Sequence, residues 1–148
     1  MRKNISKKII AYTDGGSRGN PGPAAIGVVI EGIGNEPKQY NEFIGEATNN
    51  EAEYQAVIFA LKKIRQLAGR EILKQIQVEI RLDSELVAKQ LNGEYKIEEE
   101  KLQPLFMTVW NLKFDFGNLS FKHIPREENR LADRLVNMCL DQQNSKLF

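Results

Sequence analysis

Three strand-like segments joined by short turns open this chain, and they constrain its fold more than any other feature. The segments are residues 8–14, 24–31 and 39–45, and the connections between them are rich in glycine, proline and asparagine. Short connections of this kind join neighbouring antiparallel strands, so the segments predict an antiparallel meander. The connection at residues 15–23, GGSRGNPGP, is expected to be a loop.

Helices and strands alternate through the rest of the chain. Apolar residues at helical spacing predict helices over residues 49–67, 84–91, 101–113 and 128–142. Two further strands are predicted, over residues 76–83 and 119–124. We therefore expect an α/β fold in which a five-stranded mixed sheet, with three antiparallel strands followed by two parallel ones, is flanked by helices.

Composition limits what the folded chain can be. A length of 148 residues suits a single domain, here residues 1–148, and 41% hydrophobic with 28% charged residues argues against disorder. The apolar runs are too short to span a membrane. The net charge of +1 provides no global positive field, so binding of phosphates must come from local groups or bound cations.

Cys139 is the only cysteine, which rules out an intramolecular disulfide and makes the reducing cytoplasm the expected compartment. Its place on the apolar side of the last helix predicts a core position. A group of apolar residues near the fourth predicted helix is also expected to pack in the core or at its rim: Met107, Trp110, Leu112, Phe114 and Phe116. Because this leaves no apolar face to cover, we expect a monomer.

Four acidic residues occupy positions where a solvated charge would be unusual. They are Asp14 and Asp83 at the ends of strands, Glu53 early in the first helix, and Asp133 beside apolar positions of the last helix. These positions would let the four meet at one edge of the sheet. The alternative is that each acid is a helix cap or a solvated charge, and spacing alone does not exclude it.

A cluster of four carboxylates needs a cation, because the like charges repel one another unless they are neutralised. Carboxylate oxygens favour hard divalent cations such as Mg²⁺ or Mn²⁺. Two such ions about 4 Å apart can activate a water and stabilise the leaving oxygen of a phosphodiester.

Each of the four acids lies in a short motif. The motifs are YTDGGS at 12–17 followed by GNPGP at 19–23, TNNEAE at 48–53, LDS at 82–84, and Asn129 with Ala132-Asp133. With these motifs in this order, residues 9–140 of the chain resemble type 1 ribonuclease H, the family that hydrolyses RNA paired to DNA. The resemblance implies a ribonuclease H-like fold, of the short form that lacks the basic protrusion.

The resemblance also implies the chemistry. Asp14, Glu53, Asp83 and Asp133 would be metal-binding catalytic residues that hold two Mg²⁺ ions, for which Mn²⁺ can substitute. The enzyme would cut the RNA strand of an RNA–DNA hybrid endonucleolytically, leaving 5′-phosphate and 3′-hydroxyl ends. It would need no obligatory protein partner and no membrane.

Substrate contacts are carried over from the resemblance in the same way. The implied contacts with the wide minor groove of the hybrid, or with the DNA backbone, are Gly15, Gly16, Ser17, Asn20, Thr48, Asn49 and Asn50. For the glycines the alternative is an ordinary tight turn, and for Asn49 it is a helix N-cap. Glu85 stands where the family often has Gln or Asn, so it is either a weaker groove contact or only the start of a helix.

A further catalytic role is open between two residues. The family uses a mobile His near the scissile phosphate, and His123 lies ten residues before Asp133, at the matching spacing. In short members of the family that this chain resembles, the Arg of a Pro-Arg-Glu-Glu-Asn segment takes the place of that His. The same segment is present here, so the resemblance implies that Arg126 holds the phosphate. We expect Arg126 to take this role and His123 to be the alternative.

The basic handle of longer members is missing. Glu98, Glu99 and Glu100 follow Tyr95-Lys96-Ile97 where the family resemblance leads one to expect Trp, Lys and Arg. Since each lost phosphate contact weakens binding and flattens its salt dependence, we expect weak hybrid affinity and low processivity. Two other functions stay open: a broader nuclease that also cuts double-stranded RNA, and an inactive domain that only binds hybrids.

Overall fold

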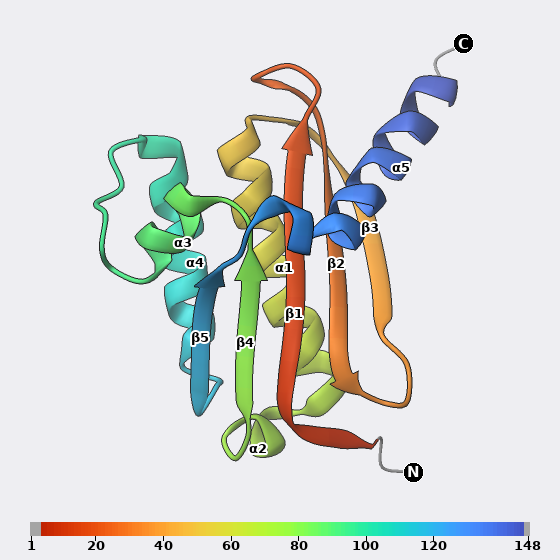
Figure 1. Ribbon diagram of the computed structural model, residues 1–148. Coiled ribbons are helices and arrows are strands. Elements are labelled where there is room, and N and C mark those ends of the chain that lie inside the picture. The colour runs from red at the N-terminus through yellow and green to blue at the C-terminus, as the bar shows by residue number, and fades with distance from the viewer. Residues whose placement is uncertain (1–3, 147–148) are drawn as a thin grey trace.

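The computed structural model describes residues 4–146, and its five strands form one sheet in the order β3-β2-β1-β4-β5 (Figure 1). The strands are β1 (Ile5–Ser17), β2 (Gly22–Ile33), β3 (Lys38–Ala47), β4 (Gln77–Leu82) and β5 (Asn118–His123). Neighbours β1, β2 and β3 pair antiparallel, whereas β4 runs parallel to β1 and β5 runs parallel to β4. The expected five-stranded mixed sheet, with three antiparallel strands followed by two parallel ones, is confirmed.

Helices cover both faces of the sheet. They are α1 (Asn49–Ala68), α2 (Arg70–Leu73), α3 (Glu85–Leu91), α4 (Gln103–Lys113) and α5 (Arg130–Lys146), with 3₁₀ turns η1 (Glu100–Leu102) and η2 (Arg126–Glu128). Helix α1 packs on one face of β1 and β2 with α4 beside it, while α5 crosses the other face over β1, β2 and β3 (Figure 1). The short α2 was not predicted from the sequence.

The main core lies between the sheet and helices α1, α3 and α4. Alternate residues of the central strands are buried there, among them Ile9, Val78 and Ile80. Helix α1 contributes Leu61 and Ile64 from its apolar stripe. Because this core fixes α1 against β1 and β4, it also fixes the relative positions of the first acidic residues.

A second, smaller core lies under α5. Val136, Cys139 and Leu140 pack there on Ala25 of β2, and each of the four is less than 10% exposed. The predicted core position of Cys139 is confirmed. This cluster anchors the last helix, which carries Asp133.

The glycine-rich stretch at 15–23 is mostly strand, so its prediction as a loop was wrong. Gly15, Gly16 and Ser17 continue β1 and pair with residues 26, 25 and 24 of β2. Glycine signals a turn because it lacks a Cβ, but the same property allows an extended strand to lie close to a helix. The connection is therefore confined to residues 18–21.

Helix α4 exposes side chains that the sequence predicted to be packed. Leu112 and Phe116 are buried, as expected. Met107, Trp110 and Phe114 are 53%, 45% and 73% exposed, so their expected packing in the core or at its rim was wrong. Val109 and Leu112 occupy the buried face of the helix, which turns the other three toward solvent. The premise that no apolar face is left uncovered is therefore wrong as well. Among residues 4–146, no helix combines the length and the apolarity needed to cross a membrane.

Candidate active site

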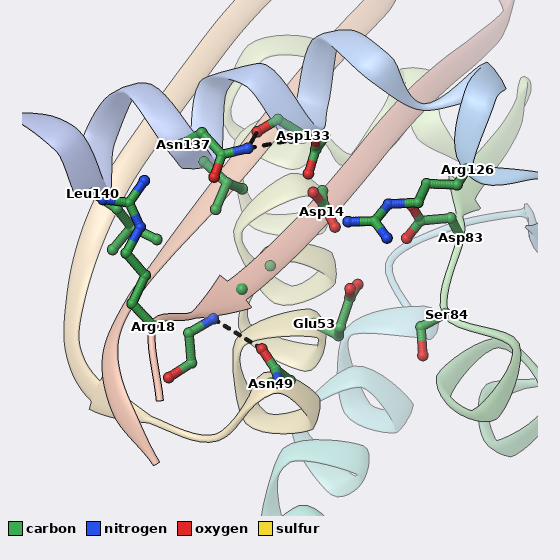
Figure 2. Close-up of a pocket in the computed structure, with 14 residues that line it drawn as sticks. Asp14, Arg18, Asn49, Glu53, Asp83, Ser84, Arg126, Asp133, Asn137 and Leu140 are labelled. Carbon is green, nitrogen blue, oxygen red and sulfur yellow. Dashed lines mark hydrogen bonds between the residues drawn. The ribbon is translucent and has the colours of Figure 1, made fainter. Parts of the chain in front are cut away.

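A cleft of about 450 Å³ opens where β1 and β4 end and α1 and α5 begin (Figure 2). All four predicted acids line it, which confirms that they meet at one edge of the sheet. The other lining residues are Gly15, Gly16, Ser17, Arg18, Asn49, Ser84, Arg126, Val136, Asn137 and Leu140.

The register of the two central strands brings Asp14 and Asp83 together. Strands β1 and β4 are parallel neighbours, and Thr13 pairs with Leu82. The residue that follows each member of this pair is an aspartate, so the two carboxylates leave the sheet at the same edge. Asp83 lies one residue beyond the end of β4, where the chain turns into α3.

A missing side chain lets Glu53 reach this edge. A Cβ at Gly15 would lie 2.2 Å from the carbonyl carbon of Ala52, so only glycine allows α1 to approach β1 this closely. Helix α1 is also fixed at its start by a capping box, in which Thr48 Oγ1 accepts from Glu51 N–H and the Glu51 carboxylate accepts from Thr48 N–H. Glu53 is thereby held in the first turns of α1, directly opposite Asp14.

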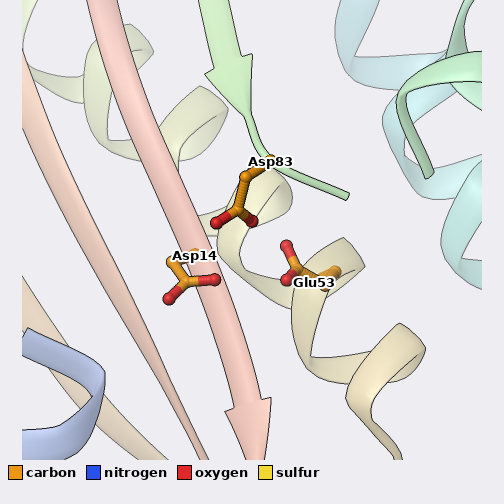
Figure 3. A group of neighbouring side chains, drawn as sticks. All are labelled: Asp14, Glu53 and Asp83. Atoms are coloured by element: carbon orange, nitrogen blue, oxygen red, sulfur yellow. The ribbon is translucent and has the colours of Figure 1, made fainter. Parts of the chain in front are cut away.

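Three of the carboxylates converge (Figure 3). One oxygen from each of Asp14, Glu53 and Asp83 lies within 4.8 Å of the other two. Glu53 Oε2 is buried and has no hydrogen-bond partner among the described residues. A buried, unpaired carboxylate oxygen is costly unless something neutralises it. These donors therefore fit a hard divalent cation.

The pKa values of the acids also indicate that this cluster is suited to a bound cation. Burial, assisted by the charges of Asp83 and Asp133, raises the pKa of Asp14 from 3.8 to about 7. Burial and the charges of Asp14 and Asp83 raise the pKa of Glu53 well above its usual value. Burial also raises the pKa of Asp83, although the positive charge of Arg126 opposes that shift. Without a cation, the cluster therefore retains protons near neutral pH.

Asp133 joins the cleft from the opposite face of the sheet. A Cβ at Gly27 would lie 2.3 Å from the carbonyl oxygen of Ala132, so this glycine lets α5 approach β2. Gly27 pairs with Asp14 across the β1–β2 ladder, which places Asp133 beside Asp14 (Figure 2). Asp133 does not belong to the group of three carboxylates within 4.8 Å.

Asn129 fixes the start of α5 to β1. Its side chain is 1% exposed, and Nδ2 donates to the carbonyl oxygen of Thr13 at 2.9 Å. The backbone carbonyl oxygen of Asn129 accepts from Asp133 N–H at 3.1 Å. The residue before Asp14 and the amide of Asp133 are thus tied to the same asparagine.

Of the two candidates for a phosphate-holding group, the structure places Arg126 in the cleft. Arg126 lies in η2, directly after Pro125, and its guanidinium points toward the carboxylates (Figure 2). His123 is exposed at the end of β5 and does not line the cleft. The predicted course of the chain, a strand end followed at once by a short turn, is confirmed.

Hydrogen bonds connect the turn after β1 to the start of α1. Ser17 N–H donates to Asn49 Oδ1 at 2.9 Å, and Asn49 N–H donates to Asn20 Oδ1 at 3.0 Å. Four of the predicted contacts, Gly15, Gly16, Ser17 and Asn49, line the cleft, whereas Asn20 does not. The N-cap of α1 is Thr48, so the alternative reading of Asn49 as the N-cap was wrong.

The remaining predicted substrate contacts, Thr48, Asn50 and Glu85, do not line the cleft. The Thr48 hydroxyl caps α1, and Asn50 Nδ2 donates to Glu99 Oε1 at 3.1 Å. Glu85 lies in the first turn of α3 and accepts from Lys89 Nζ at 2.8 Å, one helical turn later. Its local role as the start of a helix is thus evident.

Sequence reasoning missed several residues that line the cleft. Val136, Asn137 and Leu140 follow Asp133 by three, four and seven residues, which is the spacing of one helix face. Arg18 stands inside the glycine-rich motif, and Ser84 follows Asp83 directly. Their place next to the predicted acids was the signal that could have identified them.

Comparisons with known proteins agree with this geometry. Residues 12–139 match the family described as reverse transcriptase-like. Ribonuclease HI of Halobacterium salinarum is 41% identical over 135 residues, which cover 90% of this chain and 65% of the relative. The chain thus spans less than two thirds of that protein's length. Ribonuclease H of a Sulfurovum species is 37% identical, with 92% of each chain covered.

Solved structures show the same fold. LC11-RNase H1, solved in complex with an RNA/DNA hybrid, superimposes with a TM-score of 0.82 at 44% sequence identity. The match covers 91% of this chain and 98% of that one.

Proposed function

This chain belongs to the ribonuclease H family, and we propose that it is an endonuclease that hydrolyses the RNA strand of RNA–DNA hybrids. The observation that carries the proposal is the convergence of three carboxylates beside Arg126, with Glu53 Oε2 buried and unpaired. That arrangement suits cation-assisted cleavage of a phosphodiester. The hybrid bound to LC11-RNase H1 supports the choice of substrate.

We propose Asp14, Glu53 and Asp83 as the residues that hold a divalent cation, and Asp133 as the acid that completes a site for two. When bound, Mg²⁺ or Mn²⁺ ions supply an activated water and stabilise the leaving oxygen. The protein's contribution is placement: Gly15 and Gly27 allow α1 and α5 to approach the sheet, and this brings Glu53 and Asp133 to the aspartates.

Arg126 binds the phosphate at the reacting end of the cleft in this proposal. Its guanidinium offers a planar fork of donors that matches two phosphate oxygens, and it stays charged at all working pH values. For that reason it holds the phosphate and does not remove a proton. Gly15, Gly16 and Ser17 bring main chain close to the RNA sugars, and Asn49 holds Ser17 in place.

We propose a monomer that works in the cytoplasm. All four carboxylates come from one chain, so the site needs no second copy. The segment between α3 and η1, residues 92–99, is short and carries Glu94, Glu98 and Glu99 in place of a basic handle. We therefore propose that hybrid binding is weak and responds to salt less steeply than in relatives that have the handle.

The test is a cleavage assay on a labelled RNA–DNA hybrid with Mg²⁺, with Mn²⁺ and with chelator. Single-stranded RNA, double-stranded RNA and double-stranded DNA of the same sequence are run beside it, together with the Asp83→Asn variant. The proposal expects metal-dependent cutting of the hybrid's RNA strand alone, lost in the variant. Cutting of double-stranded RNA would indicate a broader nuclease, and intact binding without cutting would indicate an inactive domain.

A further inference from the structure

The cleft continues well past the carboxylates. Arg126 lies at one end, beside Asp83, and Arg18 lies at the other, with the remaining three acids between them (Figure 2). The wall between Asp133 and Arg18 is formed by Val136, Asn137 and Leu140 of α5. The proposed phosphate-binding role of Arg126 leaves this second cationic end without a function.

We propose that Arg18 binds a second phosphate of the RNA strand, on the side of the scissile phosphate away from Arg126. The proposal rests on the proposed function, since it assumes that a nucleic-acid strand lies along the cleft. A backbone in that position carries a phosphate at every nucleotide, and arginine is the side chain best suited to bind one.

The main chain around Arg18 is built to hold it in place. Arg18 N–H donates to the Pro23 carbonyl oxygen at 2.9 Å and so closes the turn between β1 and β2. A Cβ at Gly22 would lie 2.4 Å from the Arg18 carbonyl oxygen, so this turn closes only around a glycine. A side chain that starts from a fixed turn loses less freedom when it binds a ligand.

The present partner of Arg18 can be exchanged for a phosphate. Arg18 Nη2 donates to Asp141 Oδ1 at 2.6 Å, and the two side chains are 37% and 69% exposed. An ion pair this exposed contributes little to stability. The bond to Asp141 uses one nitrogen of a group that carries five N–H donors. Asp141 therefore holds the guanidinium at the mouth of the cleft and competes with an incoming phosphate.

The negative charge of the cleft explains why a cationic side chain such as Arg18 would help to bind RNA. Four carboxylates line the middle of the cleft and repel an RNA backbone until cations neutralise them. The net charge of the chain is only +1, so attraction must come from local groups. An arginine at each end of the acidic segment would attract the strand on both sides of the reacting phosphate.

A competing explanation is that Arg18 and Asp141 only tie the β1–β2 turn to α5. The two explanations predict opposite effects at Asp141. If the pair is a structural tie, Arg18→Ala and Asp141→Ala should weaken hybrid binding equally. If Arg18 binds phosphate, only Arg18→Ala should weaken binding, because Asp141→Ala frees the guanidinium.

The experiment measures hybrid affinity by fluorescence anisotropy, with every variant made in an Asp83→Asn background so that turnover is removed. We expect Arg18→Ala to weaken binding about tenfold and to reduce the salt slope by roughly one phosphate contact. Arg18→Lys should fall between Ala and Arg, because it keeps the charge and loses the fork. Asp141→Ala should bind as tightly as its parent or more tightly.

A second measurement locates the contact. Replacing single RNA phosphates with uncharged methylphosphonates should weaken binding of the parent at one phosphate near the cleavage site, and Arg18→Ala should be insensitive at that phosphate. Equal losses for Arg18→Ala and Asp141→Ala, or an unchanged salt slope in Arg18→Ala, would overturn the proposal. Failure of the wild-type chain to cut hybrids would instead count against the proposed function, because affinity is measured separately.

Discussion

Asn129 Nδ2 lies 2.9 Å from the carbonyl oxygen of Thr13, and this buried hydrogen bond joins the last helix to the residue before Asp14. The backbone carbonyl oxygen of Asn129 accepts from Asp133 N–H in the first turn of α5. The Asn129 side chain therefore anchors the start of α5, which carries Asp133, to the strand that carries Asp14. Such supporting residues are as important to a metal site as its ligands, since they orient the ligands.

We expect Asn129→Ala to lower activity and divalent-metal affinity by about tenfold or more. The variant leaves a buried carbonyl without its donor, which should also cost about 1–3 kcal/mol of stability. Titration calorimetry with Mg²⁺ or Mn²⁺ and urea unfolding measure the two effects. Asn111→Ala, at an exposed position of α4, is the matched control. Unchanged metal affinity in Asn129→Ala would show that Asn129 only stabilises the fold.

Gly15→Ala should disrupt the packing of α1 on β1. The added Cβ would lie 2.2 Å from backbone atoms of Ala52, which cannot move without shifting the helix that carries Glu53. We expect a loss of about 1–3 kcal/mol, or more, in the free energy of unfolding. At the neighbouring Gly16 a Cβ would lie 3.5 Å from Val136, an ordinary contact, so Gly16→Ala should change stability little. Equal destabilisation of both variants would contradict this account of Gly15.

Arg126→Ala should reduce kcat by about 10²-fold, the usual effect of removing one donor to a reacting oxyanion. His123→Ala should leave kcat nearly unchanged, because His123 is exposed and lies outside the cleft. Steady-state kinetics on a hybrid compares the two variants directly. Full turnover in Arg126→Ala together with lost turnover in His123→Ala would reverse the assignment.

The metal-free protein should become less stable as the pH rises. Asp14 ionises near 3.8 in the unfolded chain, and its pKa is about 7 in the folded protein. Its contribution to stability is therefore complete below pH 4 and is lost as the pH rises through 7. In chelator, the free energy of unfolding should fall between about pH 4 and pH 7 and level off above that, with a loss of at most roughly 4 kcal/mol from this residue.

Two controls isolate that effect. Asp14→Asn should remove much of the pH dependence, because an amide does not titrate, and it should unfold at a higher temperature than the wild type in chelator at pH 8. Saturating Mg²⁺ should restore the stability of the wild type at pH 8. A metal-free stability that rises from pH 5 to pH 8 in both proteins would contradict the burial of Asp14 as the cause.

The strands, their directions and the meeting of the acids could be predicted because they follow from regular patterns. Alternation identified β4, and its pairing beside β1 places Asp14 and Asp83 at one edge. The glycine-rich stretch could not be assigned correctly in the same way. Gly15 has the composition of a turn, yet its position in β1 depends on contact with Ala52, about forty residues away in the chain.

The contacts that side chains make with one another were harder to predict than the positions of the strands and of the acids. Trp110 and Phe114 are apolar, but hydrophobicity alone does not say which face of α4 meets the core. The chain also gives no local sign that Arg18 faces Asp141, which lies on the last helix. Contacts of this kind depend on how α5 crosses the sheet, and that crossing is set by close approach at Gly27.

The acids come from β1, α1, the end of β4 and α5, so the site draws on both ends of the chain. A partly folded chain that has formed the meander and α1, but has not yet docked α5, would hold Asp14 and Glu53 without Asp133. Divalent cations would then bind the completed fold more tightly than any intermediate and would favour the last docking step by mass action. Because the set of acids that binds the cations is complete only after α5 docks, cleavage activity would arise only in molecules that have finished folding.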